Sequence, residues 1–176
     1  MGHERDQPVS ADAARVTVVV KAAPERAFHI FTEEIDLWWR RGPRFRSFTA
    51  ERGLIHIEPG QGGRVFESVT EGGEERVFEI GRNLDWDPPR RLVFEWRIRN
   101  FQPHEKTVVE VLFEALRNGT RVTVTHSGWS QIRPDHPARH GLASPAFLRM
   151  MGLWWADLLT GLRERTAAYE VARARD

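Results

Sequence analysis

Short stretches of alternating apolar and polar residues fill the middle of the chain. Such alternation is typical of β-strands with one buried face, and the glycine and proline pairs between the stretches mark turns. The pairs Gly72-Gly73 and Asn118-Gly119 predict hairpins. We expect strands over residues 15–21, 45–51, 54–57, 64–70, 75–86, 92–99, 107–116 and 120–127.

Apolar residues recur at helical spacing near both ends of the chain. Pro24 opens the first of these segments, and the apolar spacing as far as Trp38 predicts one or two short amphipathic helices. Ser144 is expected to cap a final long helix that has Pro145 as its first residue and ends at about Ala172. Strands in the middle with helices at both ends predict an α+β fold with an antiparallel sheet, and not a βαβ parallel sheet.

The length of 176 residues suits one domain. We expect residues 1–14 to form a flexible polar tail and residues 15–172 to form a single domain. Residues 1–14 lack the apolar run of a secretory signal. No stretch approaches the roughly 18 apolar residues of a membrane span, so a cytoplasmic location is expected.

The predicted strands and the final helix each present an apolar face. On the helix, Trp155, Leu159 and Leu162 follow one another at i, i+4 and i+7. On the strands, the residues expected to share inward faces are Phe78, Ile80, Leu84 and Trp86; Leu92, Phe94, Trp96 and Ile98; and Val122, Val124 and His126. The chain has 7 tryptophans, and so many large rings are hard to pack densely unless some of them line a cleft.

Charge and motif content narrow the functional classes. The 26 basic and 25 acidic side chains give a net charge of +1, so no long-range field draws in nucleic acid or an anionic membrane. The absence of cysteine excludes disulfides and thiolate metal sites. His136 and His140 have metal-like spacing, but Pro137 interrupts them, so we expect no metal and no cofactor. No dedicated catalytic motif is present.

Several motifs occur in a familiar order: RVTVVVKAAPERAFHIFTEEIDLWW, EPGQGGRVFE, WDPPRRLVFEW, TVVEVLFEALRNGTRVTVTHSGW and the long final helix. Together, from about residue 15 to residue 169, they resemble the START-related SRPBCC superfamily. Within it they resemble bacterial domains related to the activator of the heat-shock-protein-90 ATPase. The resemblance implies a helix-grip fold, in which a curved antiparallel sheet wraps a C-terminal helix and two short helices close one end. It also implies a ligand cavity between sheet and helix, although one fold hosts many functions.

The leading hypothesis is therefore binding of a small or medium-sized hydrophobic or aromatic ligand. Arg64 could clamp a ligand anion, or form a structural ion pair with a partner such as Glu79. Glu33 and Glu34 are expected to be solvated helix acids. The arginines at 40, 41, 44 and 46 are expected to form a solvated rim. The residues expected to line the cavity are Trp38, Phe66, Phe78, Phe94, Trp96, Trp155 and Leu159, with His126 as a polar contact.

Two alternatives stay open. The first is an enzyme that cyclises, dehydrates or hydrolyses a bound aromatic or polyketide-like substrate, with His126 moving protons; a buried structural histidine is the competing interpretation. The second is a co-chaperone or stress-related role. A chaperone partner is not expected, because the related eukaryotic co-chaperones carry an additional N-terminal domain that this sequence does not show. A homodimer is also compatible with the sequence.

Overall fold

The computed structural model describes residues 12–48 and 53–175. In these ranges, strands fill the middle of the chain and helices lie on either side of them. The elements are β1 (Ala13–Val20), α1 (Pro24–Thr32), α2 (Ile35–Trp38), β2 (Leu54–Ile57), β3 (Arg64–Glu71), β4 (Glu74–Asp87), β5 (Arg91–Trp96), β6 (Thr107–Leu116), β7 (Gly119–Ser127), the short 3₁₀ turns η1 (Trp129–Gln131) and η2 (Pro137–Arg139), and α3 (Ser144–Arg173).

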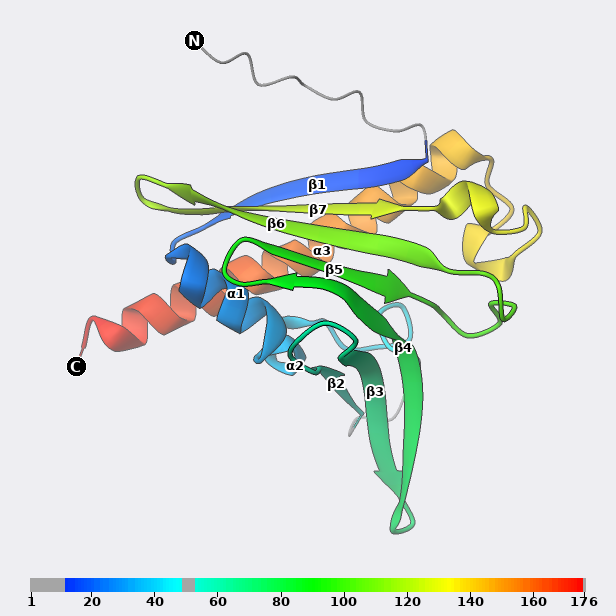
Figure 1. Cartoon of the computed structure of the whole chain (residues 1–176), viewed down its shortest axis with the longest axis horizontal. Coiled ribbons are helices and arrows are strands. Elements are labelled where there is room, and N and C mark those ends of the chain that lie inside the picture. Colours follow the sequence, from blue (N-terminus) through cyan, green and yellow to red (C-terminus); the bar gives the residue numbers. More distant parts are fainter. Residues whose placement is uncertain (1–11, 49–52, 176) are drawn as a thin grey trace.

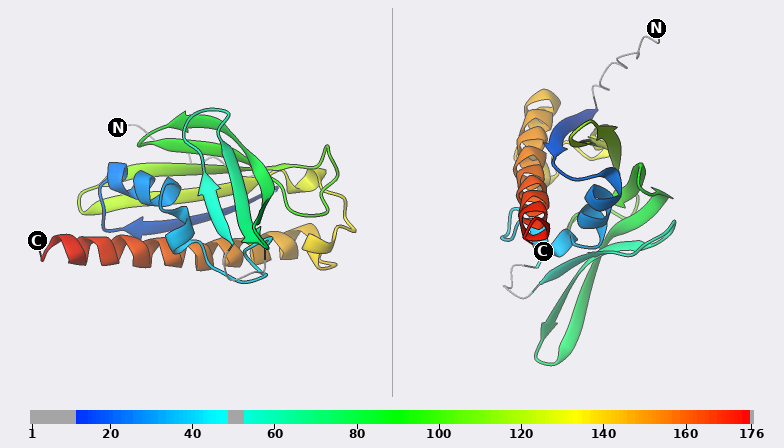
Figure 2. Two further views of the ribbon diagram at one scale, coloured as in Figure 1. Left: turned by 90° about the horizontal axis from the view of Figure 1, so that it is seen from below. Right: turned by 90° about the vertical axis from the view of Figure 1, so that its left-hand side faces the viewer.

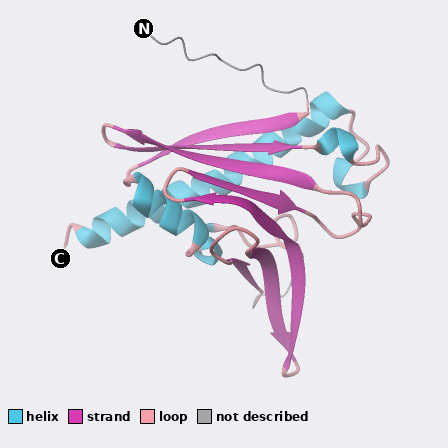
Figure 3. Ribbon diagram, in the orientation of Figure 1, coloured by secondary structure: helices cyan, strands magenta, loops and turns pink. Residues whose placement is uncertain are grey.

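The strands form one curled antiparallel sheet in the order β1-β7-β6-β5-β4-β3-β2 (Figures 1 and 3). Helix α3 runs along one side of this sheet, as the two turned views show (Figure 2). The β3–β4 hairpin extends away from the rest of the sheet like an arm (Figure 1). The chain therefore has the helix-grip architecture that the sequence predicts.

The inward faces of the central strands follow the predicted alternation. Leu92, Phe94 and Trp96 of β5 are buried, as are Val122, Val124 and His126 of β7. On α3, the buried residues recur every three or four positions and form the stripe expected of a helix with one face on a sheet. They include Phe147, Met151, Trp155, Leu158, Leu159 and Leu162. In the part of the chain that the structure describes, no helix combines the length and the apolar character needed to cross a bilayer.

Strand β4 departs from the predicted alternation. Leu84, expected inside, is 43% exposed. The pairing of β4 shifts register opposite Val65 and Phe66 of β3 and again between Asn83 and Asp85, where it meets β5. Each such irregularity adds one residue to one strand and reverses which side chains face inward, so simple alternation fails across it.

Several predicted boundaries also need correction. Residues 45–48 form turns, not a strand, and residues 49–51 of that prediction lie outside the described residues. Strand β5 ends at Trp96 instead of continuing to Arg99. Helix α3 begins at Ser144, so Ala143 and not Ser144 precedes it. Of the predicted tail, residues 1–11 lie outside the described residues, whereas Ala13 and Ala14 already pair with β7.

Helix α3 approaches α2 closely at a glycine. A Cβ atom on Gly161 would lie 2.5 Å from the Trp38 carbonyl oxygen, far inside normal contact distance. Gly152, nine residues earlier on the same helix, has no atom within 4 Å of an added Cβ. Only the first of these two glycines is therefore required by packing.

We predict that Gly161→Ala lowers the free energy of unfolding by ~1–3 kcal/mol, because the backbone of α2 must move away from α3. Gly152→Ala is the matched control and should raise it by ~0.5–1 kcal/mol, because alanine loses less backbone entropy in a helix. Urea unfolding followed by circular dichroism measures both effects. Equal shifts for the two variants would contradict the close approach at Gly161.

Candidate functional site

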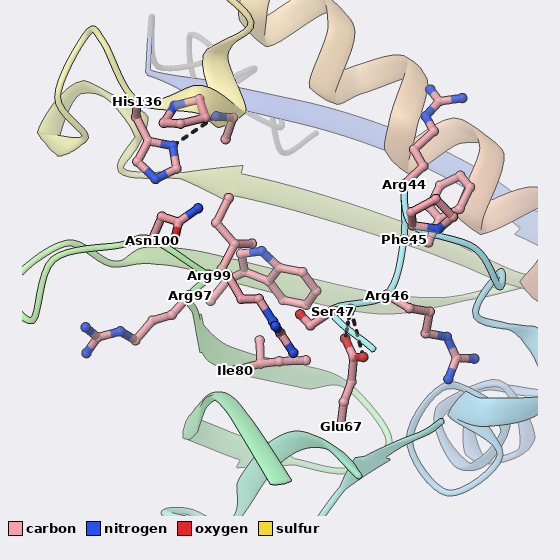
Figure 4. Close-up of a pocket in the computed structure, with 15 residues that line it drawn as sticks. Arg44, Phe45, Arg46, Ser47, Glu67, Ile80, Arg97, Arg99, Asn100 and His136 are labelled. Atoms are coloured by element: carbon pink, nitrogen blue, oxygen red, sulfur yellow. Dashed lines mark hydrogen bonds between the residues drawn. The ribbon is translucent and has the colours of Figure 1, made fainter. Parts of the chain in front are cut away.

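A pocket of about 360 Å³ opens beside the end of β5 (Figure 4). Its apolar surface comes from Ile80, Trp96 and Ile98, together with Pro43, Phe45, Pro137 and Ala138. Its polar groups come from the segments of residues 43–47, 97–100 and 136–138 and from Glu67 of β3. The pocket thus combines an aromatic and aliphatic surface with hydrogen-bonding groups.

Glu67 is the buried acid of this pocket. It is only 3% exposed, because its side chain shares the inward face of β3 with Val65. Its carboxylate oxygens accept hydrogen bonds from the backbone N–H of Ser47 at 2.8 and 2.9 Å (Figure 4) and from the backbone N–H of Phe48 at 3.1 Å. Among the described residues, no arginine or lysine forms an ion pair with it. A carboxylate can accept about four hydrogen bonds, so Glu67 keeps acceptor capacity for a ligand.

His136 lies across the pocket from Glu67 and is 2% exposed (Figure 4). Its Nδ1 accepts the backbone N–H of Ala138 at 3.0 Å, so the proton of the neutral ring is on Nε2. Burial, followed by the nearby Arg133 charge, lowers the pKa of His136, although the Asn100 carbonyl opposes this. Among the described residues, Nε2 has no partner with hydrogen-bond geometry. The Asn100 carbonyl acts on the ring without meeting this geometry, so His136 presents a neutral donor whose hydrogen bond is incomplete.

The arginines around the pocket differ in their roles. Arg99 extends toward Ile80, and its guanidinium carbon lies 5.1 Å and 5.7 Å from the ring centres of Phe48 and Phe78 (Figure 4). Arg97 points away from the pocket and donates to the Gln102 carbonyl at 2.9 Å. Arg99 is thus the cation whose position suits contact with a ligand.

Arg46 is a structural residue, and its prediction as part of a solvated rim is wrong. Its buried guanidinium pairs with Asp36 at 2.7 Å and donates to the Trp39 carbonyl at 2.8 Å. Burial opposes ionisation of Asp36, but hydrogen bonds from Arg46 and the Ile55 N–H outweigh it and lower the pKa of Asp36. These contacts hold the loop of residues 43–47 in the place where a strand was expected.

Of the residues predicted to line a cavity, Trp96 lines this pocket. The centre of the grip beside it is packed with aromatic rings. Trp39 stacks on Trp96 with ring centres 5.5 Å apart and meets Trp155 edge-on at 5.6 Å. Phe94, Trp155 and Leu159 are at most 1% exposed and belong to this core, outside the pocket lining.

Trp38 and Phe78 lie at the edges of other hollows. Trp38 lines one of about 300 Å³ beside α3, and its indole N–H donates to the Ile30 carbonyl at 3.0 Å. Phe78 lines one of about 420 Å³ on the β3–β4 arm. Neither residue contacts the pocket at Trp96.

Phe66 and Arg64 lie on the outer face of β3, so the expectation that Phe66 faces inward is wrong. Phe66 stacks on His56, with ring centres 4.7 Å apart, and Arg64 lies over the same ring. Arg64 pairs with Glu58 at 2.6 Å, and this bond lowers the pKa of Glu58 to about 2. The structural ion-pair interpretation of Arg64 is therefore confirmed, with Glu58 and not Glu79 as its partner.

His126 is fully buried and forms a closed chain of hydrogen bonds. Its Nδ1 accepts the Trp155 indole N–H at 3.1 Å, so its proton is on Nε2 and points to Thr107 Oγ1 at 2.7 Å. The Thr107 hydroxyl in turn donates to the Trp96 carbonyl at 3.1 Å. Burial lowers the pKa of His126 to about 3. A neutral histidine with both nitrogens engaged is structural, so the geometry argues against His126 as ligand contact or proton carrier.

Glu34 is another structural charge. It pairs with Arg165 of α3 at 2.7 Å and with Arg26 at 2.6 Å, and so ties the region between α1 and α2 to α3. Burial opposes ionisation, but these arginines lower the pKa of Glu34 below its usual value. Residues 12–48 and 53–175 contain no group of three or more His, Asp or Glu side chains placed to hold a metal ion.

The comparisons with known proteins agree with this fold. The family model described as "Activator of Hsp90 ATPase homolog 1-like protein" matches residues 21–151. The chain belongs to this family. It is the group, within the SRPBCC superfamily, that the sequence motifs indicate. No curated protein sequence is significantly similar to the chain.

Solved structures share the family fold at low identity. ChR145 from Cytophaga hutchinsonii has a TM-score of 0.62 and 15% identity, over 91% of this chain and 96% of its own. The Aha1 dimer from Colwellia psychrerythraea gives 0.56 and 16%, over 86% and 93%. DynU16, a protein of the dynemicin biosynthetic locus, gives 0.57 and 19%, over 87% of this chain and 46% of its own. These likenesses show the fold alone.

Sequence reasoning missed Glu67 and His136 as pocket residues. Glu67 shares strand parity with Val65 and Val69, a weak signal that it faces inward, but the larger ring of Phe66 favoured the opposite face. His136 was considered only as a metal ligand. The contact of its loop with residues 97–100 is long-range, and no local pattern indicates it.

We predict that lowering the pH from about 6.5 to about 5 destabilises the protein, with His126 contributing ~1.4 kcal/mol per pH unit at most. The pKa of His126 is lowered from 6.5 to about 3, so between these pH values the unfolded chain binds a proton at this residue and the folded chain does not. In His126→Gln, the glutamine amide can accept from Trp155 and donate to Thr107 but cannot titrate. The number of protons taken up on unfolding, and with it the slope of the free energy of unfolding against pH, should therefore fall by about one proton. Urea unfolding at several pH values measures it.

His136→Asn is the necessary comparison, because the lowered pKa of His136 contributes in the same pH range. An unchanged pH slope in His126→Gln would contradict the neutral, buried state of His126.

Proposed function

We propose that this protein binds a small molecule with an aromatic or apolar body in the pocket formed by Ile80, Trp96 and Ile98. The supporting observation is the combination of this apolar surface with Glu67 and His136 in a space of about 360 Å³. That volume falls within the range of small-molecule sites, which are mostly apolar and carry a few polar groups that orient the ligand. The site differs from the expected central cavity, because tryptophans occupy the centre.

The experiment is a titration with small aromatic compounds, followed by the indole N–H resonance of Trp96 in two-dimensional NMR. We expect this resonance to shift on binding. Ile98→Trp should fill the pocket and weaken binding at least about tenfold, or by about 1.4 kcal/mol. Leu153→Trp, at a site on α3 that is 69% exposed, adds the same side chain away from the pocket and should leave binding unchanged. No shift with any compound, or equal weakening by both variants, would refute the proposal.

A second candidate is partner binding of the kind that the family name describes. The match over residues 21–151 favours it, and the Colwellia relative is an Aha1 dimer. A cytoplasmic, stress-related role and a homodimer belong to this candidate. Addition of the protein should then raise the ATPase rate of a purified bacterial Hsp90 chaperone, and light scattering after gel filtration should give twice the chain mass. A monomer with no effect on the rate would refute it.

A further inference from the structure

The pocket contains two buried polar groups of opposite hydrogen-bonding character. Glu67 offers acceptors on one side, and His136 offers a donor on the other (Figure 4). On the basis of the proposed function, we infer that the ligand is an aromatic acid that also carries a hydrogen-bond donor, such as an amino or hydroxyl group, at its other end. The donor group contacts Glu67 and the acid group contacts His136.

Glu67 sets the chemistry of one end. A buried carboxylate is costly unless it is paired or fully hydrogen-bonded. Two backbone N–H groups supply its bonds from the described residues, and no arginine or lysine among them forms an ion pair with it. An ammonium or hydroxyl group of a ligand would add a charge-assisted hydrogen bond to an oxygen already held rigidly by the loop of residues 43–47. An acid group at this position would instead be repelled.

His136 sets the chemistry of the other end. The Ala138 N–H bond to Nδ1 places the proton on Nε2, and no described acceptor lies within hydrogen-bond geometry of that atom. An unmade hydrogen bond at a buried donor is unfavourable, so an acceptor that reaches it gains more than an exposed contact would. Asn100 lines the pocket on the same side, whereas the Arg99 guanidinium lies on the other side, toward Ile80 (Figure 4). A carboxylate oxygen is a strong acceptor for the Nε2 donor.

Binding of four related compounds to the unmodified protein tests the inference directly. 4-(Aminomethyl)benzoate carries both groups, benzylamine only the donor, benzoate only the acid, and toluene neither. We expect the bifunctional compound to bind about tenfold more tightly than either single-group compound, and toluene to bind most weakly. Isothermal titration calorimetry and NMR titration measure the series.

Two variants assign the groups to their ends. Glu67→Gln removes the charge but keeps an amide oxygen for the Ser47 N–H, and should weaken benzylamine about tenfold while leaving benzoate unchanged. His136→Asn keeps an acceptor for the Ala138 N–H but removes the Nε2 donor, and should weaken benzoate and not benzylamine. Glu79→Gln, which removes an exposed carboxylate paired with Arg82, is the control and should change neither.

The outcomes separate the two proposals. If toluene binds at the Trp96 pocket as tightly as the substituted rings, the inference is overturned while the proposed aromatic site stands. If Glu67→Gln and His136→Asn weaken both single-group compounds equally, the assignment of ends is overturned. If none of the four compounds shifts the Trp96 resonance, both proposals fail. Because the compound series uses the unmodified protein, the test does not depend on the variants folding.

Discussion

The structure depends on how the indole of Trp155 is buried between the sheet and α3. A tryptophan there contributes a large apolar area, but its N–H needs an acceptor inside the core. His126 provides that acceptor, and Thr107 and the Trp96 carbonyl complete the chain of hydrogen bonds from α3 through β7 and β6 to β5. A single chain of polar contacts thus fixes the position of the helix on three neighbouring strands, and it does so only while His126 stays neutral.

This arrangement decides where open space remains between the sheet and the loops. The Trp155 indole N–H bonds to His126, and Trp39 stacks on Trp96 and meets Trp155 edge-on. These rings fill the space between the sheet and α3. The remaining space lies at the end of β5, where one side of Trp96 meets the loop that Arg46 holds through Asp36 and the Trp39 carbonyl. Since loops and not strands form most of that wall, the pocket is open and combines polar groups with its apolar surface, unlike the enclosed apolar cavity that the motifs suggested.

The sequence predicted correctly those features that a pattern within one helix or strand determines. Strand β6 and the buried stripe of α3 were predicted because burial there repeats with the period of the element. The prediction failed at Leu84, where register shifts reverse the faces, and at residues 45–48, where the Phe45 carbonyl and the Arg46 guanidinium bond to Trp39, a residue outside the segment. Of the residues expected to line a cavity, only Trp96 lines the pocket at the end of β5. Glu67 depends on the parity of β3 relative to β4, and His136 depends on a contact between distant loops. No local sequence pattern indicates the position of either residue.

The division between core and rim has a consequence for specificity. The contacts that set the fold, from Trp155 to His126 and from Gly161 to Trp38, involve none of the loop residues that surround the pocket. Changes in residues 136–138 can therefore alter the polar groups of the pocket without changing these contacts, whereas the loop of residues 43–47 is tied to α3 by the Trp154 N–H bond to the Arg44 carbonyl. Structures with 15–19% identity retain this fold, which is the behaviour expected when the core sets the architecture and exposed loops carry recognition. If the proposed function holds, the polar groups that select the ligand are Glu67 and His136, and not the tryptophans that dominate the interior.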